Sequence, residues 1–150
     1  GTDLNKVLSH AVHLGVTEAV LTGVTGRRTD HTLWNLSLLK TFADRLRLHI
    51  TDDHCHIHLL GEGTMTQFAA NLGQRLSLSP LDGSTQDVWT EGLRWPLAGV
   101  RLDSGRRDGI SNEVVAFPAS VRIGGPGDLL LIVQRQSDSG GGEIEFLDPT

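Results

Sequence analysis

The sequence is poor in cysteine, in long apolar runs and in basic clusters, and each shortage excludes a class of protein. Cys55 is the single cysteine among 150 residues, which excludes an internal disulfide and a zinc site with several cysteines. The longest apolar run, Leu129 to Val133, is far shorter than the ~20 residues that cross a bilayer. The 13 Lys and Arg residues are scattered and the net charge is -5, which argues against a nucleic-acid partner. We therefore expect a cytoplasmic protein without a membrane span.

The remaining composition is that of an ordinary globular protein, with 38% hydrophobic and 21% charged residues. A chain of this length buries about 70% of the surface that it exposes when unfolded. One sizeable core, or two small ones, can therefore form without disulfides.

The first third of the chain alternates helical and strand patterns. Two segments, 3–14 and 30–45, repeat apolar residues at the three-and-four spacing of an amphipathic helix. The apolar residues predicted to share one face are Leu4, Val7, Leu8, Ala11 and Leu14 in the first segment, and Leu33, Leu36, Leu39, Phe42, Ala43 and Leu46 in the second. Strand patterns follow at 16–23 and 47–52. This order of helix, strand, helix and strand predicts a parallel α/β unit over residues 1–53, with a right-handed crossover.

After Asp53 the pattern changes to short strands separated by Gly, Pro, Asp and Ser. The predicted strands are 54–60, 64–70, 74–80, 88–92, 98–102, 114–123 and 128–134. Their even spacing predicts a β-sandwich or barrel over residues 54–136. Residues 137–150 contain three consecutive glycines and show no periodicity, so we expect a mostly mobile tail.

A glycine loop, Gly23 to His31, lies between the first predicted strand and the second predicted helix. Glycines let a backbone approach a ligand closely, a helix N-terminus offers unpaired N–H groups, and Arg27 and Arg28 supply paired donors for phosphate oxygens. The spacing is not that of a Walker loop. The alternative is a tight turn in which Asp30 caps the helix and the arginines are only solvated.

Four further groups of residues are each open to two interpretations. Thr2, Asp3 and Lys6 offer a carboxylate and an ammonium for a metal-bound nucleotide, or an N-cap and an ion pair within one helix. His54, His56 and His58 share one face of a predicted strand, which is either a partial zinc site or a half-buried surface. The segment 109–113 is predicted to be a polar turn, and its Ser111 and Asn112 could bind a small heterocycle. Trp89 and Trp95 could stack on a cationic ring or pack in the core.

Taken in chain order, five motifs closely resemble those of the thiamine pyrophosphokinase family. They are Thr2-Asp3-Leu-Asn-Lys6, the stretch 26–35 (GRRTDHTLWN), Leu76 to Leu81 (LSLSPL), Gly92 to Leu97 (GLRWPL) and Gly109-Ile-Ser111-Asn112. The stretch 26–35 is the most specific, because it matches the family pattern at Gly26, Arg28, Asp30, His31, Leu33 and Asn35. The resemblance spans residues 2 to 134.

The resemblance implies a fold and an activity. It implies part of a Rossmann-like α/β domain in residues 1–53, followed by an antiparallel, thiamine-binding β-sandwich. It also implies a homodimer that transfers pyrophosphate from Mg²⁺-ATP to thiamine, giving thiamine diphosphate and AMP.

The resemblance also implies residue roles. Asp3, Arg28 and Asp30 would be catalytic, with Asp3 also holding Mg²⁺. Thr2, Lys6, Gly26, Arg28 and Asn35 would bind ATP, and Ser111 and Asn112 would bind thiamine beside the α/β domain of a second subunit.

The sequence also departs from the family pattern. The family's acidic G-D-x-D-S motif does not occur in these 150 residues, and Arg27 stands where many members have glycine. The alternative is therefore a non-catalytic module that binds thiamine or dimerises. A metal-binding β protein built on the three histidines is a third hypothesis.

Overall fold

The computed structural model describes residues 3–26, 28–107, 109–136 and 144–147. The chain divides into two compact units, residues 1–53 and residues 54–150. This division falls at the boundary that the change of sequence pattern predicts. In the described part of the chain, no helix is long and apolar enough to cross a membrane.

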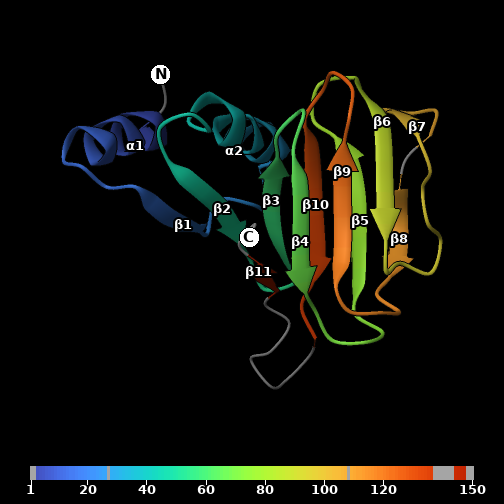
Figure 1. The fold of residues 1–150 in the computed structure, drawn as a ribbon. Helices are drawn as coiled ribbons and strands as arrows, with labels where there is room; N and C mark the ends of the chain where they lie inside the picture. Colours follow the sequence, from blue (N-terminus) through green and yellow to red (C-terminus); the bar gives the residue numbers. More distant parts are fainter. Residues whose placement is uncertain (1–2, 27, 108, 137–143, 148–150) are drawn as a thin grey trace. The chain divides into compact units, whose positions relative to one another are not determined.

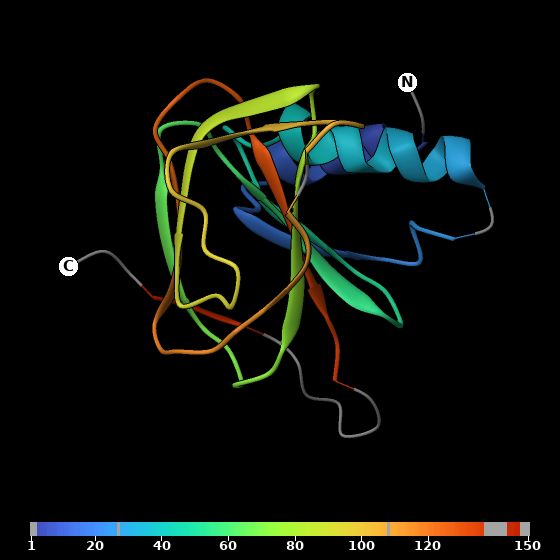
Figure 2. The same cartoon turned by 90° about the vertical axis from the view of Figure 1, so that its right-hand side faces the viewer.

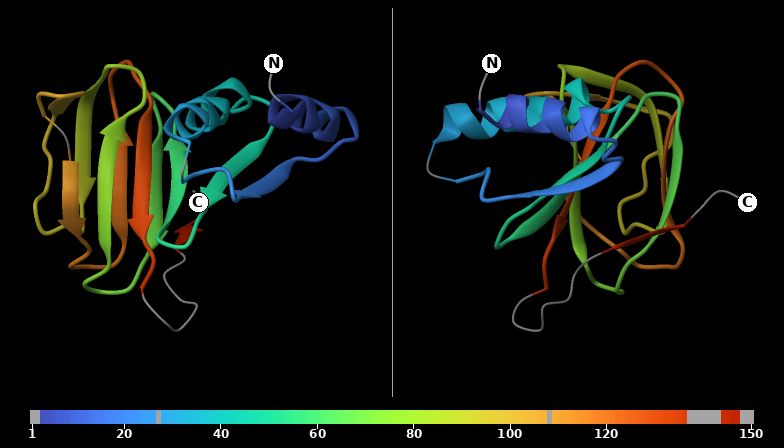
Figure 3. Two further views of the ribbon diagram at one scale, coloured as in Figure 1. Left: turned by 180° about the vertical axis from the view of Figure 1, so that it is seen from behind. Right: turned by 90° about the vertical axis from the view of Figure 1, so that its left-hand side faces the viewer.

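The first unit consists of two helices and two strands (Figure 1). In chain order they are α1 (Asp3–His13), β1 (Glu18–Thr22), α2 (Thr29–Thr41) and β2 (Arg47–Thr51). β1 and β2 pair in parallel, from Glu18 opposite Arg47 to Thr22 opposite Thr51, and α2 forms the crossover between them. Both helices lie on the same side of this strand pair (Figure 3). The predicted parallel α/β unit is therefore present.

The apolar faces of the two helices are only partly buried. Val7 and Leu14 of the first pattern are exposed, and Leu8 is the buried residue of α1. In α2, Leu33 is 62% exposed, whereas Asn35, Leu38 and Leu39 are buried. The α2 sequence places leucines at 33, 36, 38 and 39, so its apolar residues surround much of the helix and periodicity alone does not select a face.

The second unit is built from nine strands in two sheets, which Figure 2 shows as two layers. One sheet has the order β3 (Cys55–Leu60), β10 (Leu129–Gln134), β5 (Arg75–Pro80) and β8 (Gly109–Glu113). The other has the order β11 (Glu145–Leu147), β4 (Met65–Ala69), β9 (Ala119–Ile123), β6 (Ser84–Glu91) and β7 (Val100–Asp103). All the pairings within these two groups are antiparallel.

The core of the second unit lies between its two sheets. Alternate residues of β5 and β10, such as Leu78 and Leu131, are buried together with Phe68 of β4, Val88 of β6 and Val121 of β9. Residues between them on the same strands face outward, as period-two alternation requires. The predicted β-sandwich is thus observed. On the outward face of the sheet that contains β6 and β9, residues around Trp89 and Ser120 form a cavity.

Three strand predictions fail for identifiable reasons. Residues 109–113 were expected to form a turn but are strand β8, because they pair with β5. The predicted strand 114–123 is interrupted, and β9 begins only after Pro118, which has no N–H to donate to a ladder. The expected tail contains strand β11, which pairs with β4; the rest of 137–150, apart from residue 144, lies outside the described residues.

Candidate functional site

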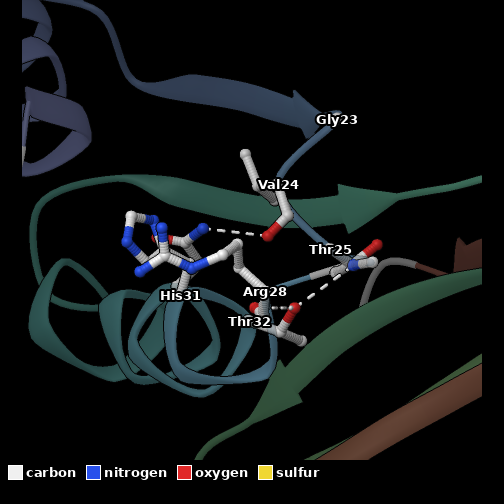
Figure 4. A pocket seen from close by; sticks show the side chains of 8 residues that line it. Gly23, Val24, Thr25, Arg28, His31 and Thr32 are labelled. Atoms are coloured by element: carbon white, nitrogen blue, oxygen red, sulfur yellow. Dashed lines mark hydrogen bonds between the residues drawn. The ribbon is translucent and has the colours of Figure 1, made fainter.

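The loop from Gly23 to Arg28 joins the carboxyl end of β1 to the first turn of α2. It borders a cavity of about 320 Å³ (Figure 4). The lining residues are Gly23, Val24, Thr25, Gly26, Arg28, His31, Thr32 and Asn35. In open parallel α/β units, the crevice beyond the carboxyl ends of the strands is the usual place for ligands. The candidate phosphate loop that the sequence predicts therefore borders a cavity.

Side-chain hydrogen bonds hold this loop in place. Asn35 Nδ2 donates to the Val24 carbonyl at 2.9 Å, and Thr25 Oγ1 donates to Asp52 Oδ2 at 2.9 Å. The Gly26 N–H donates to Thr32 Oγ1 at 3.2 Å, and that hydroxyl donates to the Arg28 carbonyl at 3.1 Å (Figure 4). Gly26 has a φ of 127°, a backbone conformation that residues with a Cβ rarely adopt. The sequence motif thus encodes the shape of the loop as well as its charge.

Arg28 and Asp30 form a two-point ion pair at the edge of the cavity. Arg28 Nε lies 3.3 Å from Asp30 Oδ1, and Arg28 Nη2 lies 3.0 Å from Asp30 Oδ2. The side chains are 70% and 67% exposed, so solvent weakens the pair. The hydrogen bond from Arg28, followed by that from the His31 backbone N–H, lowers the pKa of Asp30.

The alternative in which Asp30 caps α2 is wrong. The residue at the N-cap position is Arg28, which has extended dihedral angles and makes no side-chain capping bond. Asp30 lies in the first turn, where a carboxylate interacts favourably with the helix dipole, and its Oδ1 accepts the N–H of His31 at 2.9 Å.

Asp3 and Lys6 lie in the first turns of α1, as predicted. Within the described residues they form no ion pair with each other. Nor does any described contact join them to Arg28 or Asp30. Thr2 and Arg27 lie outside the described residues. The structure therefore gathers Gly26, Arg28 and Asn35 at one cavity and leaves Asp3 and Lys6 as available charged groups.

Ser111 and Asn112 differ sharply in environment although they are neighbours on β8. Ser111 is exposed, has a φ of 65°, and donates its N–H to Ser77 Oγ at 3.0 Å. Asn112 is 5% exposed. Its Oδ1 accepts the N–H groups of Trp95 at 3.1 Å and Glu113 at 2.9 Å, and its Nδ2 donates to the Trp95 carbonyl at 2.9 Å. Asn112 thus positions Trp95.

The sequence named Trp95 as a possible stacking residue but did not show its hydrogen bonds to Asn112. The Trp95 side chain is 54% exposed, and the Arg94 guanidinium lies 4.9 Å from the ring centroid. Arg94 Nη1 also lies 3.3 Å from Glu113 Oε2. Because Trp95 and Asn112 are 17 positions apart, only the folded chain shows their connection.

The histidine strand does not form a metal chelate. His56 on β3 is 3% exposed, and the His58 ring contacts the edge of Phe146, with the centroids 4.9 Å apart. Across the described residues, no group of three or more His, Cys, Asp or Glu side chains could hold a metal ion. The structure gives the metal-binding hypothesis for this strand no support.

Comparisons of sequence and of structure both find similarity to thiamine pyrophosphokinases. Residues 64–124 match the family model described as the thiamin pyrophosphokinase, vitamin B1 binding domain. Thiamine pyrophosphokinase 2 of Oryza sativa subsp. japonica is 28% identical over 131 residues, covering 81% of this chain and 48% of the relative. Thiamine pyrophosphokinase of Bacillus subtilis is 26% identical over 115 residues, covering 76% and 54%. The chain therefore spans about half the length of these relatives.

Solved structures share the fold. The crystal structure of thiamine pyrophosphokinase from Bacillus subtilis superposes with a TM-score of 0.77 at 23% identity, over 91% of this chain and 64% of that one. The protein from Geobacillus thermodenitrificans gives a TM-score of 0.73 at 25% identity, over 93% and 63%.

The fold and the matched domain define a parallel α/β segment followed by a β-sandwich that is similar to the vitamin B1 binding domain of thiamin pyrophosphokinases. The resemblance carried by the sequence motifs is confirmed, because the chain is similar to thiamine pyrophosphokinases in both sequence and fold.

Proposed function

We propose that this chain is part of a thiamine diphosphokinase, which transfers a pyrophosphoryl group from ATP to the hydroxyl of thiamine and releases AMP. The observation that carries the proposal is the match of residues 64–124 to the vitamin B1-binding domain. The matched relatives bear the same name. These names favour the kinase over a non-catalytic module that only binds thiamine or dimerises.

The nucleotide half of the site is assigned to the cavity beside Gly26. Arg28 is exposed at its edge and carries a guanidinium that suits paired hydrogen bonds to phosphate oxygens. Asp30 holds Arg28 in place before the phosphate arrives, and Lys6 and Thr2 add a cation and a hydroxyl. Asn35 acts through the Val24 carbonyl, because its amide fixes the loop.

The Gly26 N–H has a partner in Thr32, so a phosphate oxygen would have to displace that hydroxyl to reach it. Catalysis by these groups consists of positioning the polyphosphate and stabilising its charge, which is the main task in phosphoryl transfer. Arg28 binds and orients the transferred group in this scheme.

The donor set fits a magnesium ion that arrives with ATP. Mg²⁺ in such sites is held by one or two carboxylates together with phosphate oxygens and water. Asp3 offers an exposed carboxylate outside any ion pair that the described residues form, and no cage of three protein ligands surrounds it. Asp3 would therefore hold the ion, which would neutralise phosphate charge.

The thiamine half is assigned to Ser111 and Trp95. Ser111 offers an exposed hydroxyl, while Asn112 acts by fixing the Trp95 backbone. An exposed indole can stack on a cationic ring, and thiamine carries one. Ile110 and Phe117 are also exposed apolar side chains of this unit. Their exposure supports a homodimer that contributes the second wall of the thiamine site.

The test measures both products of the proposed reaction. The purified protein is incubated with thiamine and Mg²⁺-ATP, and thiamine diphosphate and AMP are quantified. We expect equal amounts of both, a loss of at least tenfold in rate for Arg28→Ala, and no change for Arg47→Gln, an exposed arginine on β2. Thiamine binding without either product would overturn the kinase proposal and leave the non-catalytic module.

A further inference from the structure

A second cavity lies on the outward face of the sheet β11-β4-β9-β6-β7. Its volume is about 200 Å³. The lining residues are Met65, Trp89, Thr90, Glu91, Pro96, Leu97, Ala98, Ser120 and Arg122. Ser111 and Asn112 belong to β8 in the other sheet, and Trp95 does not line this cavity, although its neighbour Pro96 does.

The register of three strands explains the hollow. Ser120 of β9 lies opposite Glu91 of β6, and Arg122 lies opposite both Trp89 of β6 and Met65 of β4. Residues directly opposite on antiparallel strands project from the same face. A short serine side chain is thus surrounded by four long ones, which leaves a depression with the serine at its floor.

Neighbouring groups hold the cavity walls in place. The Leu97 N–H donates to Thr90 Oγ1 at 2.8 Å, and the Thr90 N–H donates to the Leu97 carbonyl at 2.9 Å. Trp89 Nε1 donates to Asp87 Oδ1 at 2.6 Å, which fixes the indole. A Cβ on Gly99 would lie 3.1 Å from the Trp89 ring, so only glycine lets the chain pass there without strain. The cavity is therefore a built feature of the sheet.

Three polar groups at this cavity have no hydrogen-bonding or ionic partner among the described residues. Ser120 is 4% exposed, yet its hydroxyl makes no hydrogen bond there. Glu91 forms no ion pair, and the Arg122 guanidinium contacts only the Trp89 ring, 5.0 Å from its centroid. The Ser120 oxygen is not among the fully buried side-chain atoms without a partner, so it is accessible from the cavity. An accessible hydroxyl and two exposed charges around one hollow are groups that a polar ligand could bind.

Glu91 and Arg122 carry opposite charges but do not meet. They stand diagonally across β6 and β9, where the separation in a sheet is about 7–8 Å. Long side chains can reach across that separation, yet Glu91 and Arg122 form no ion pair among the described residues. Both charges are therefore available to a small molecule with a positive group at one end and a negative group at the other. The walls contributed by Trp89, Pro96 and Leu97 are apolar.

We propose that this cavity binds a small zwitterion of the amino-acid class. Its ammonium group pairs with Glu91, its carboxylate pairs with Arg122 and accepts from the Ser120 hydroxyl, and a modest apolar side chain packs against Trp89 and Leu97. The volume is below the ~300 Å³ at which drug-sized ligand sites begin, which fits a ligand of this size. The proposal does not depend on the kinase activity.

The test uses three probes that share the valine side chain. L-valine carries both charges, L-valinamide lacks the carboxylate, and N-acetyl-L-valine lacks the ammonium group. The ¹⁵N-labelled protein is titrated with each probe, and the Trp89 indole N–H and Ser120 amide signals are followed by NMR. We expect saturable shifts with L-valine. Each of the other two probes should bind about fivefold more weakly, because each loses one partly exposed charge contact.

Two variants test which charged residue of the cavity binds which end of the ligand. Glu91→Gln should weaken the binding of L-valine about fivefold and leave the binding of N-acetyl-L-valine unchanged. Arg122→Gln should weaken the binding of L-valine and leave the binding of L-valinamide unchanged. Glu145→Gln, on β11 of the same sheet, is the matched control and should bind L-valine as the parent chain does. Equal binding of all three probes, no shift at Trp89, or indifference to both variants would overturn the proposal.

Discussion

At the scale of single residues, Asn112 shows how a site residue can act through its neighbours. Its amide satisfies both backbone groups of Trp95 and the N–H of Glu113. Asn112→Ala would leave these groups unpaired inside the protein, so we expect the free energy of unfolding to fall by about 2 kcal/mol. Urea unfolding followed by circular dichroism measures this change. Ser111→Ala, at an exposed side chain, should change it by less than about 0.5 kcal/mol; similar losses for both would contradict the assignment.

The ion pair between Arg28 and Asp30 makes a prediction about pH. Arg28 lowers the pKa of Asp30, so this carboxyl favours the folded state above its unfolded pKa of about 3.9, and the contribution disappears as pH falls through the lower folded value. Arg28→Gln should raise the pKa of Asp30 towards its ordinary value. A ¹³C NMR titration of the carboxyl carbon measures the shift. Arg47→Gln should leave this titration unchanged, and an unaltered Asp30 curve in Arg28→Gln would show that another group lowers the pKa.

At the scale of elements, the glycine loop depends on the helix that follows it. The Thr32 hydroxyl accepts the Gly26 N–H and donates to the Arg28 carbonyl. Thr32→Val removes both bonds at nearly constant shape, so amide exchange at Gly26 should accelerate by about fivefold, as the loss of about 1 kcal/mol requires. Thr41→Val is the matched control, because Thr41 Oγ1 donates to the Ser37 carbonyl at 3.2 Å within the same helix. Equal exchange at Gly26 in both variants would refute the role of Thr32.

The helices and strands also show which parts of the fold the sequence could predict and which it could not. Local periodicity located both helices and most strands, because alternation and three-and-four spacing follow directly from backbone geometry. It missed β8, since Gly109 to Glu113 has the composition of a turn and becomes a strand only by pairing with β5, where Asn112 lies opposite Leu76. For the candidate site, the motifs predicted Arg28 and Asn112, whereas their hydrogen bonds to Thr32 and Trp95 depend on the folded backbone.

At the scale of the whole molecule, the two units differ in how much apolar surface they bury internally. Residues 54–150 contain a buried cluster of fourteen hydrophobic residues, among them Leu131 and Phe68. The 53-residue first unit leaves Val20 and Trp34 exposed, and a chain of about 60 residues buries only about 60% of its unfolded surface, which makes its stability marginal. The β-sandwich therefore has the features of an independently folding domain, and the α/β segment lacks them.

We expect residues 54–150 alone to unfold cooperatively in urea with a dispersed NMR spectrum, and residues 1–53 alone to show neither property. Leu131→Ala tests whether the buried cluster is responsible, because this side chain is fully buried and its loss should lower the free energy of unfolding of the 54–150 fragment by about 3 kcal/mol. Leu72→Ala, at an exposed position of the same fragment, should change it by less than about 0.5 kcal/mol. A cooperative transition in residues 1–53 would mean that the parallel strand pair and its two helices are stable despite their exposed apolar side chains.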